Sequence, residues 1–289
     1  MQKIGFIGIG KIGLPICGHL IKNGYTVIGY RRSSLADFES LGGAAARSPA
    51  DVAAQVDHVF TCLPSDEALE EVVCGPSGLL KSVRPGQIIT ELGSHPVAVK
   101  QRYVTPLADR GAVFLDGEVS GTPGMVAQRK GAIYLAGPID PVRKIEPVVA
   151  AFADLCLYLG EFGAATKVKL VNNFLVALNI AGTAQAMALG LKAGVDKDLL
   201  IKAVASGSGG STQFGIRAPW MAERKFLPQQ GSGAGLAHYL DTARDMAKDA
   251  GVATDLLDFL IDLFARAVPG IGDRDIAAMI EFFETTRRT

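Results

Sequence analysis

The sequence predicts an α/β domain over residues 1–163 and an all-α domain over residues 164–289, joined by a long interdomain helix. Three observations lead to this fold class. A chain of 289 residues is typical of about two domains. Before Gly163, short apolar runs alternate with helix-like segments, which predicts a mostly parallel sheet with helices on its faces. After Gly163 the strand-like runs end, and helical patterns separated by turn signals follow.

The first domain should contain a strand at each of its short apolar runs. These runs are rich in Val, Ile, Phe and Tyr and are bounded by Gly, Pro or Asp, as buried strands are. They are KIGFIG from Lys3, TVIGY from Thr26, DHVFTCL from Asp57, QIITEL from Gln87, GAVFLDG from Gly111, GAIYLAG from Gly131 and LCLYLG from Leu155. Helix-like segments such as KIGLPICGHLIKNG and PVAVKQRYVTPLADRG lie between most of them.

The second domain should begin with the long helix, which runs from Thr166 to Ala193 and is ended by Gly194. Asn and Gln side chains interrupt its apolar pattern, whereas a membrane span needs at least ~18 apolar residues with few interruptions. We therefore interpret it as a buried core helix and expect no membrane partner. Shorter helices are expected near Asp198–Ser206, Ile216–Arg224, Leu236–Ala250, Thr254–Ala267 and Arg274–Glu284.

Composition and charge exclude several classes of function. Hydrophobic residues make up 48% and charged residues 20%, which is typical of a globular protein and not of a disordered one. The 29 basic and 29 acidic side chains balance without a basic stripe, so no nucleic-acid partner is expected. The four cysteines form no C-x-x-C pair, and we expect no leader before the first strand-like run. We therefore expect a cytoplasmic protein with reduced thiols and no metal site.

A glycine motif follows the first expected strand directly. The segment Gly8-Ile9-Gly10-Lys11-Ile12-Gly13 matches G-x-G-x-x-G at the point where a strand passes into a helix. In such a turn the first glycine allows a tight bend, the second lets a pyrophosphate approach, and the third lets helix and strand pack closely. Free N–H groups at the helix start attract phosphates. The motif predicts dinucleotide binding and a Rossmann-type domain; the alternative is a purely structural turn.

The end of the second expected strand indicates which dinucleotide is bound. NAD-binding domains usually carry an acidic residue there, which holds the ribose 2′-hydroxyl. This sequence has Tyr30-Arg31-Arg32-Ser33 instead, and no acidic residue before Asp37. A guanidinium suits a 2′-phosphate because its N–H groups can make paired charged hydrogen bonds. We therefore expect NADP(H); the alternative is that both arginines are solvated surface charges.

Four sequence blocks, in this order, resemble the β-hydroxyacid dehydrogenase family. They are Gly5 to Arg32, Asp57 to Pro64, Leu115 to Thr122 with Gly124 and Gly131, and Gly160 to Gly163 leading to Lys169-Leu170-Val171-Asn172-Asn173. The family includes 3-hydroxyisobutyrate dehydrogenase and tartronate semialdehyde (glyoxylate) reductases, with an NAD(P)-binding domain of the 6-phosphogluconate dehydrogenase type. The resemblance covers nearly the whole chain.

The resemblance implies a role for residues of each block. Lys169 is the expected general acid–base of hydride transfer between nicotinamide and a 3-hydroxy acid or semialdehyde. Asn173 lies four residues later, on the same helical face, and is expected to bind substrate. Further substrate contacts are expected from Ser120, Gly121 and Thr122, and a loop covering the cofactor from Cys62, Leu63 and Pro64.

The sequence departs from the family pattern at several points. His238-Tyr239 stands where the family often has Lys-Asp, and Glu118 where it commonly has Pro. The D-x-S-T-x-x-P segment appears as Thr90 to Pro96, in which Ser94 is the candidate for the cofactor-binding threonine. We hypothesise that Glu118 and His238-Tyr239 favour a larger, aromatic or amino-bearing hydroxy acid. The alternative is that Glu118 faces solvent and the late helix packs differently.

Some functional questions remain open in the sequence. Phe214 ends a segment that resembles a substrate-facing turn, but Phe214 and Trp220 could equally be core residues. An imine reductase of similar architecture and a non-catalytic NADP-binding protein are alternatives to the dehydrogenase; the presence of Lys169 counts against both. The family and the apolar second domain also imply a homo-oligomer, a homodimer or a tetramer.

Overall fold

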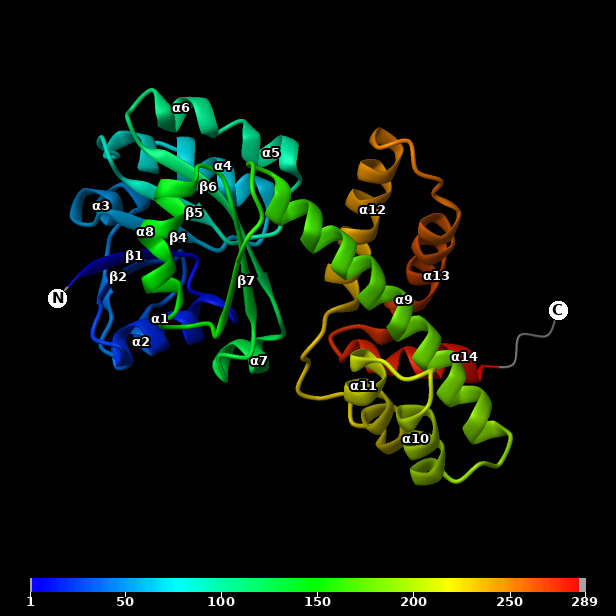
Figure 1. Cartoon of the computed structure of the whole chain (residues 1–289). Helices are drawn as coiled ribbons and strands as arrows, with labels where there is room; N and C mark the ends of the chain where they lie inside the picture. Colours follow the sequence, from blue (N-terminus) through cyan, green and yellow to red (C-terminus); the bar gives the residue numbers. More distant parts are fainter. Residues whose placement is uncertain (1, 286–289) are drawn as a thin grey trace. The chain divides into compact units, whose positions relative to one another are not determined.

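The structure, a computed structural model, describes residues 2–285 and divides the chain into two compact units. These units are Met1–Lys169 and Leu170–Thr289, and the division falls inside the long helix α9 (Ala164–Lys192), which Figure 1 shows in green. We refer to them as the sheet unit and the helical unit. The division lies within the expected long helix, a few residues after its start.

The sheet unit contains one eight-stranded sheet with the order β3-β2-β1-β4-β5-β6-β7-β8. All the expected strands form, and one short strand, β3, was not expected. The strands are β1 (Lys3–Ile7), β2 (Thr26–Tyr30), β3 (Ala44–Ala45), β4 (His58–Thr61), β5 (Ile88–Glu91), β6 (Val113–Ser120), β7 (Ala132–Ala136) and β8 (Leu155–Tyr158).

The sheet is mostly parallel, as predicted, with one antiparallel pair. Strands β1 to β6 run parallel, whereas β7 pairs antiparallel with β6, and β8 follows β7 in parallel. The reversal follows from the short connection between Ser120 and Ala132, because a parallel crossover needs a longer return.

Helices cover both faces of this sheet and bury alternate residues of its strands. In β4, for example, Val59 packs in one apolar cluster and Phe60 in the other. The segment from Pro96 to Gly111 forms two short helices rather than one. The helices are α1 (Gly13–Lys22), α2 (Ala36–Ser40), α3 (Pro49–Gln55), α4 (Asp66–Cys74), η1 (Leu79–Lys81), α5 (Val97–Gln101), α6 (Val104–Ala108), α7 (Pro123–Ala127) and α8 (Ile139–Val149).

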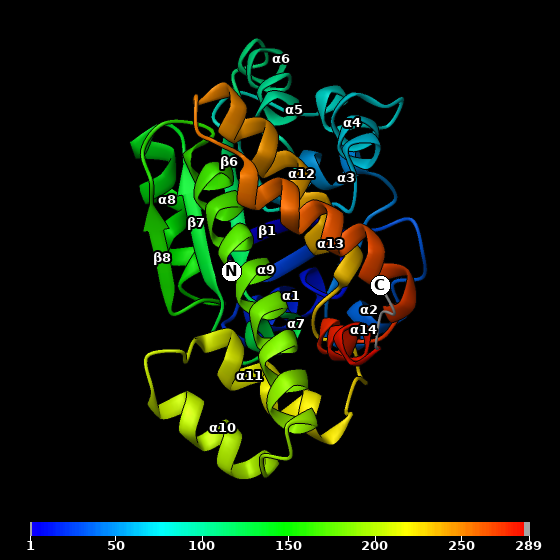
Figure 2. The same cartoon turned by 90° about the vertical axis from the view of Figure 1, so that its right-hand side faces the viewer.

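The helical unit contains the greater part of α9 and the remaining helices around a separate apolar core. α12 and α13 run side by side (Figures 1 and 2). Among the described residues, α9 is the one helix apolar and long enough to cross a membrane by composition and length. The helices after α9 are α10 (Lys197–Ser206), α11 (Thr212–Glu223), α12 (Gly233–Asp249), α13 (Asp255–Ile271), η2 (Ile276–Ala278) and α14 (Met279–Glu284).

Three helix boundaries in this unit were expected at the wrong positions. α13 ends at Ile271 rather than near Ala267, and capping explains the other two. α11 begins at Thr212 rather than near Ile216, because the Ser211 hydroxyl accepts a hydrogen bond from the Phe214 N–H at 3.0 Å. The last expected helix, from Arg274, is divided into η2 and α14. Asp275 accepts from the Ala277 N–H at 2.9 Å and starts the short 3₁₀ turn there.

Candidate active site

The predicted cofactor and substrate residues of the sheet unit meet at one edge of its sheet. Strands β1, β2, β4, β5 and β6 are parallel, so their carboxyl ends lie along the same edge. The strand order reverses between β1 and β4, and ligands of open α/β sheets bind at such a switch point. The segments that leave this edge start at Gly8, Arg31, Cys62, Leu92 and Gly121.

The three glycines of the turn after β1 occupy three different environments. Gly8 has φ +92°, and a Cβ atom there would lie 2.1 Å from the Cys62 carbonyl oxygen. A Cβ on Gly13 would lie 2.4 Å from the Gly8 carbonyl oxygen. A Cβ on Gly10 would meet no heavy atom within 4 Å among the described residues. The first and third glycines are therefore required by packing, and the second leaves open space, as a pyrophosphate site requires.

The start of α1 suits an anion. Within its described first turn α1 carries no acidic residue, and its N-cap residue, Ile12, makes no side-chain capping hydrogen bond. The backbone N–H groups of such a turn can bind phosphate oxygens. Lys11 is exposed beside them, whereas Ile9 is fully buried and anchors the turn. These features fit a dinucleotide.

After β2, one of the two predicted phosphate-binding arginines already has a partner. The Arg31 guanidinium donates to both Asp37 oxygens, at 2.5 and 3.1 Å, and to the Ile9 carbonyl oxygen at 2.7 Å. The hydrogen bond from Arg31 lowers the pKa of Asp37. Arg32 and Ser33 are exposed, and Tyr30 is half-buried. Asp37, the first acidic residue after β2, is thus brought next to the Arg31 guanidinium and paired with it.

The loop after β4 adjoins a buried polar cluster on β5 and its following loop. The Thr61 hydroxyl and the Gly93 N–H both donate to the Glu91 carboxylate. His95 lies 2.7 Å from Asp66 through Nδ1 and 3.6 Å from Glu91 through Nε2. Burial would lower the pKa of His95, but Glu91 and Asp66 outweigh it and raise that pKa.

Burial lowers the pKa of a histidine but raises that of a cysteine, such as Cys62 in the loop after β4. Desolvation, with Glu91 and Glu118 nearby, raises the pKa of Cys62 to about 12. Burial and the two carboxylates therefore disfavour the thiolate of Cys62, the form of a cysteine that acts as a nucleophile. Of the two residues that complete the loop, Leu63 is partly buried and Pro64 is exposed.

β6 and α5 contribute a fully buried ion cluster. Lys100 Nζ lies 2.9 Å from Asp116 Oδ1 and 3.1 Å from Glu118 Oε1. Ser94 donates to the other Glu118 oxygen, so the loop after β5 is fixed to β6. Glu118 is fully buried, which excludes the solvent-facing alternative. A direct contact between Glu118 and substrate stays a prediction.

Lys169 lies beside this cluster and is itself buried, with 8% of its surface exposed. Its Nζ donates to the Val119 carbonyl oxygen at 2.9 Å. Burial lowers the pKa of Lys169, and the negative charge of Glu118 opposes this effect. The amine therefore lies next to the predicted substrate loop, in an environment that favours deprotonation more than water does.

The substrate loop itself follows directly. Ser120 ends β6, and Gly121 leads into α7. Thr122 caps α7 by accepting a hydrogen bond from the Met125 N–H at 3.3 Å. This cap occupies one lone pair of the Thr122 hydroxyl and leaves the hydroxyl proton for a ligand.

The other predicted substrate residues belong to the helical unit. Asn173 is 5% exposed, and its Nδ2 has no hydrogen-bond partner among the described residues. Phe214 packs in the core of the helical unit, the alternative that the sequence left open. His238 is exposed on α12, with its ring 6.1 Å from that of Tyr239. A substrate contact stays a prediction for all three.

Sequence reasoning missed several members of the buried polar cluster. Glu91, His95, Lys100, Asp116 and Thr166 were not among the expected site residues. The available signal was an acidic residue inside an apolar strand run, in QIITEL and GAVFLDG. Acidic side chains are rarely buried without a partner, so each implied a buried cation or donor nearby.

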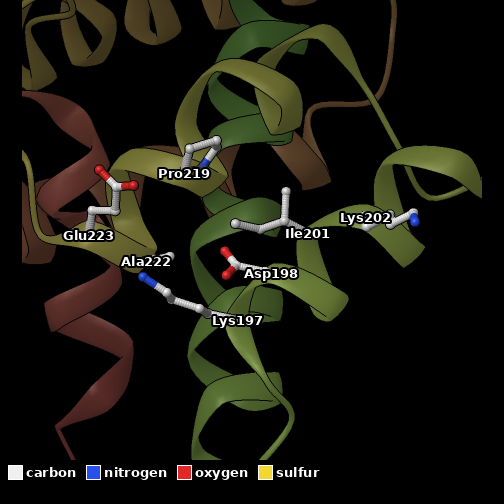
Figure 3. Close-up of a pocket in the computed structure, with 7 residues that line it drawn as sticks. All are labelled: Lys197, Asp198, Ile201, Lys202, Pro219, Ala222 and Glu223. Atoms are coloured by element: carbon white, nitrogen blue, oxygen red, sulfur yellow. The ribbon is translucent and has the colours of Figure 1, made fainter.

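A separate hollow lies in the helical unit between α10 and α11 (Figure 3). It has a volume of about 230 Å³ and contains none of the predicted site residues. Its walls carry charges of both signs, from Lys197, Asp198, Lys202 and Glu223. We assign it no role in the site described above.

Comparison with known proteins agrees with this geometry. Residues 3–160 match the family described as the NAD binding domain of 6-phosphogluconate dehydrogenase. Residues 163–283 match the family described as NAD-binding of NADP-dependent 3-hydroxyisobutyrate dehydrogenase.

Individual relatives span most of the chain. Mitochondrial 3-hydroxyisobutyrate dehydrogenase of Rattus norvegicus is 32% identical, over 87% of this chain and 75% of that protein. L-threonate dehydrogenase of Cupriavidus necator is 31% identical, over 98% and 96%. A crystal structure of 3-hydroxyisobutyrate dehydrogenase from Salmonella typhimurium has a TM-score of 0.87 at 23% identity, covering 98% of this chain and all of that one. This last likeness shows the fold.

Proposed function

The chain belongs to the β-hydroxyacid dehydrogenase family, and from this premise we propose that it transfers hydride between NADP(H) and a 3-hydroxy acid or the matching semialdehyde, with Lys169 as general acid–base. One observation carries the proposal. The Lys169 amine is buried and lies 2.9 Å from the Val119 carbonyl oxygen, one residue before the predicted substrate loop. A lowered pKa brings this amine closer to neutral pH, where an acid–base group works best.

In the proposed mechanism, Lys169 moves the proton that accompanies hydride transfer. When bound, the nicotinamide ring would supply or take the hydride. During reduction the carbonyl oxygen gains negative charge, and the Lys169 ammonium donates a proton to it. During oxidation neutral Lys169 takes the hydroxyl proton as hydride leaves the carbon. Ser120 and Thr122 would bind the carboxylate and hydroxyl of the substrate. Acid–base help of this kind is worth ~10²–10⁴-fold in rate.

The preference for NADP(H) is part of the proposal and has its own support. Asp37, the acidic residue nearest the end of β2, is already paired with Arg31, so it is poorly placed to accept from a ribose hydroxyl. Arg32, the residue after Arg31, is exposed and can bind a 2′-phosphate. Arg32→Ala should therefore raise the KM for NADP⁺ and leave that for NAD⁺ nearly unchanged.

The test is a turnover panel followed by nicotinamide absorbance. It pairs NADP⁺ and NAD⁺ with 3-hydroxyisobutyrate, L-serine, L-threonate and larger aromatic hydroxy acids, and NADPH and NADH with the semialdehydes and with an imine. Lys169→Ala should lower kcat by ~10²–10⁴-fold. Lys167→Ala is the matched control, because Lys167 is exposed on the same turn of α9. Equal activity in the two variants would overturn the role of Lys169. Turnover of an imine but of no hydroxy acid would overturn the substrate class.

A further inference from the structure

The strand that carries the substrate loop also carries two buried carboxylates on one side. Asp116 and Glu118 are two residues apart in β6, so their side chains leave the same face of the sheet. Both are fully buried, and Lys100 Nζ lies between them, within 3.1 Å of each. Lys100 Nζ also donates to the Gly117 carbonyl oxygen at 3.0 Å. The three donors of this ammonium are thus all used inside the cluster.

The same two carboxylates hold the start of α9. The Thr166 N–H donates to Asp116 Oδ2 at 3.0 Å, which caps the first turn of the helix. The Thr166 hydroxyl lies 2.7 Å from Asp116 Oδ1 and 3.2 Å from Glu118 Oε1. Thr166 is three residues before Lys169, so the two side chains lie on neighbouring positions of one helical face. The cluster therefore fixes the turn from which Lys169 extends.

We propose that Glu118 is a positioning residue for Lys169. Its carboxylate, held by Lys100, Ser94 and Thr166, fixes the turn of α9 that carries the amine, while the Lys169 amine donates to the carbonyl oxygen of the next residue, Val119. The proposal rests on the proposed function for its catalytic meaning. It differs from the hypothesis that Glu118 binds substrate, because Glu118 then acts only through Lys169.

The electrostatic argument follows from the charges around Lys169. Burial disfavours the ammonium and lowers the pKa of Lys169, and Glu118 is the neighbouring charge that opposes this. Burial likewise raises the pKa of Glu118, whereas Lys100, the Ser94 hydrogen bond and Lys169 favour its ionised form. Other ionisable groups that act on this cluster are Asp116 on β6, Glu91 on β5, and Cys62 and His95 in the loops after β4 and β5. Glu118 is thus a carboxylate whose charge depends on Lys100.

The coupling can be measured without turnover. The full-length protein, labelled with ¹³C at the lysine ε-carbon, is titrated by NMR, and the Lys169 signal is assigned by its loss in Lys169→Met. In Glu118→Gln the pKa of Lys169 should fall by about one unit, the size expected for losing a nearby opposite charge. Glu118→Asp should restore most of the shift. Glu161→Gln is the matched control, because Glu161 is exposed close to the start of α9.

The pH profiles add a readout that a merely structural role would not move. For alcohol oxidation, which needs neutral Lys169, the acidic limb in Glu118→Gln should shift to lower pH by the same amount. For reduction, the alkaline loss of rate should begin at lower pH. If the variant is too unstable to titrate, Glu118→Leu replaces it, because it also removes the carboxylate while Lys100 keeps Asp116 as its buried partner.

The outcomes separate this inference from the proposed function. An unchanged Lys169 pKa in folded Glu118→Gln would overturn the inference, whatever the enzyme turns over. A lower kcat with an unmoved pKa and pH profile would also overturn it, because Glu118 would then be only structural. A shifted Lys169 pKa in a protein that oxidises no hydroxy acid would support the coupling and overturn the proposed function alone.

Discussion

At Gly8, two separate constraints act on one backbone position. Its φ of +92° lies in the region that side chains other than glycine rarely adopt, and a Cβ would overlap the Cys62 carbonyl oxygen at 2.1 Å. Relieving the overlap would require the turn after β1 to move away from β4. Gly10, two residues later, has neither constraint among the described residues.

We therefore expect opposite phenotypes from two alanine substitutions in the same turn. Gly8→Ala should lower the free energy of unfolding by about 3 kcal/mol or more, because strain and overlap add. Gly10→Ala should leave that free energy nearly unchanged but weaken NADPH binding, since the methyl group would occupy the space left for the pyrophosphate. Urea unfolding and fluorescence titration with NADPH measure the two effects. Equal NADPH affinity in Gly10→Ala and the wild type would contradict this assignment of the open space.

At the scale of single elements, the loop between β5 and α5 carries a pH-dependent contact. His95 is buried between Asp66 and Glu91, and its pKa in the folded protein is raised despite burial. The protonated His95 therefore stabilises the fold fully below its ordinary pKa of about 6.5. This contribution is lost as pH rises through the folded-state pKa.

His95→Gln should remove this contribution at acidic pH. At alkaline pH, where the contribution is already lost in the wild type, the substitution should have a smaller effect on the free energy of unfolding. The free energy of unfolding, measured in urea at about pH 5.5 and about pH 8.5, should differ from the wild type more at the lower pH. His58 is an internal control of opposite sign, because burial lowers its pKa. In the wild type, protonation of the buried His58 at acidic pH lowers the free energy of unfolding, and His58→Gln should remove this loss. If His95→Gln lowered the free energy of unfolding equally at both pH values, relative to the wild type, His95 protonation would make no contribution to stability.

The same elements show which parts of the site a sequence can predict. The glycine turn and the Lys169–Asn173 spacing are local patterns, because their geometry follows from a strand-to-helix turn and from one helix. Lys100 could not be predicted in this way. Its role depends on β5 and β6 lying side by side with Glu91 opposite Asp116, and on α5 packing over them. The partner of Arg31 was missed for the same reason, since α2 folds Asp37 back onto the end of β2.

The sequence did contain a signal for the two helix starts that were expected at the wrong positions. Ser211 stands at the start of α11 and Asp275 at the start of η2, and both residue types are favoured at helix N-caps. An acidic residue within an apolar strand run was also visible, in QIITEL and GAVFLDG. What no local pattern supplies is the identity of the partner, because the partner comes from another strand or helix.

At the scale of the whole molecule, the sheet unit and the helical unit have separate apolar cores, and the helical unit contains its own buried ion pair. Arg217 Nη1 lies 2.6 Å from Asp275 Oδ1, and Asp275 is fully buried. The other Asp275 oxygen accepts hydrogen bonds from the N–H groups of Gln230 and Gly231. Asp275 thus joins α11, the loop before α12 and η2.

Asp275→Ala should destabilise the helical unit by about 3–5 kcal/mol, because it leaves the Arg217 guanidinium buried without its carboxylate. Asp262→Ala is the matched control. It breaks the exposed Arg266–Asp262 pair of α13, and should cost less than about 1 kcal/mol. Because the cores are separate, hydrogen exchange should speed up in residues 170–285 while the strands of the sheet unit keep their protection and NADPH still binds. Loss of protection in β1 and β4 to the same extent as in α11 would show instead that the two units unfold as one cooperative body.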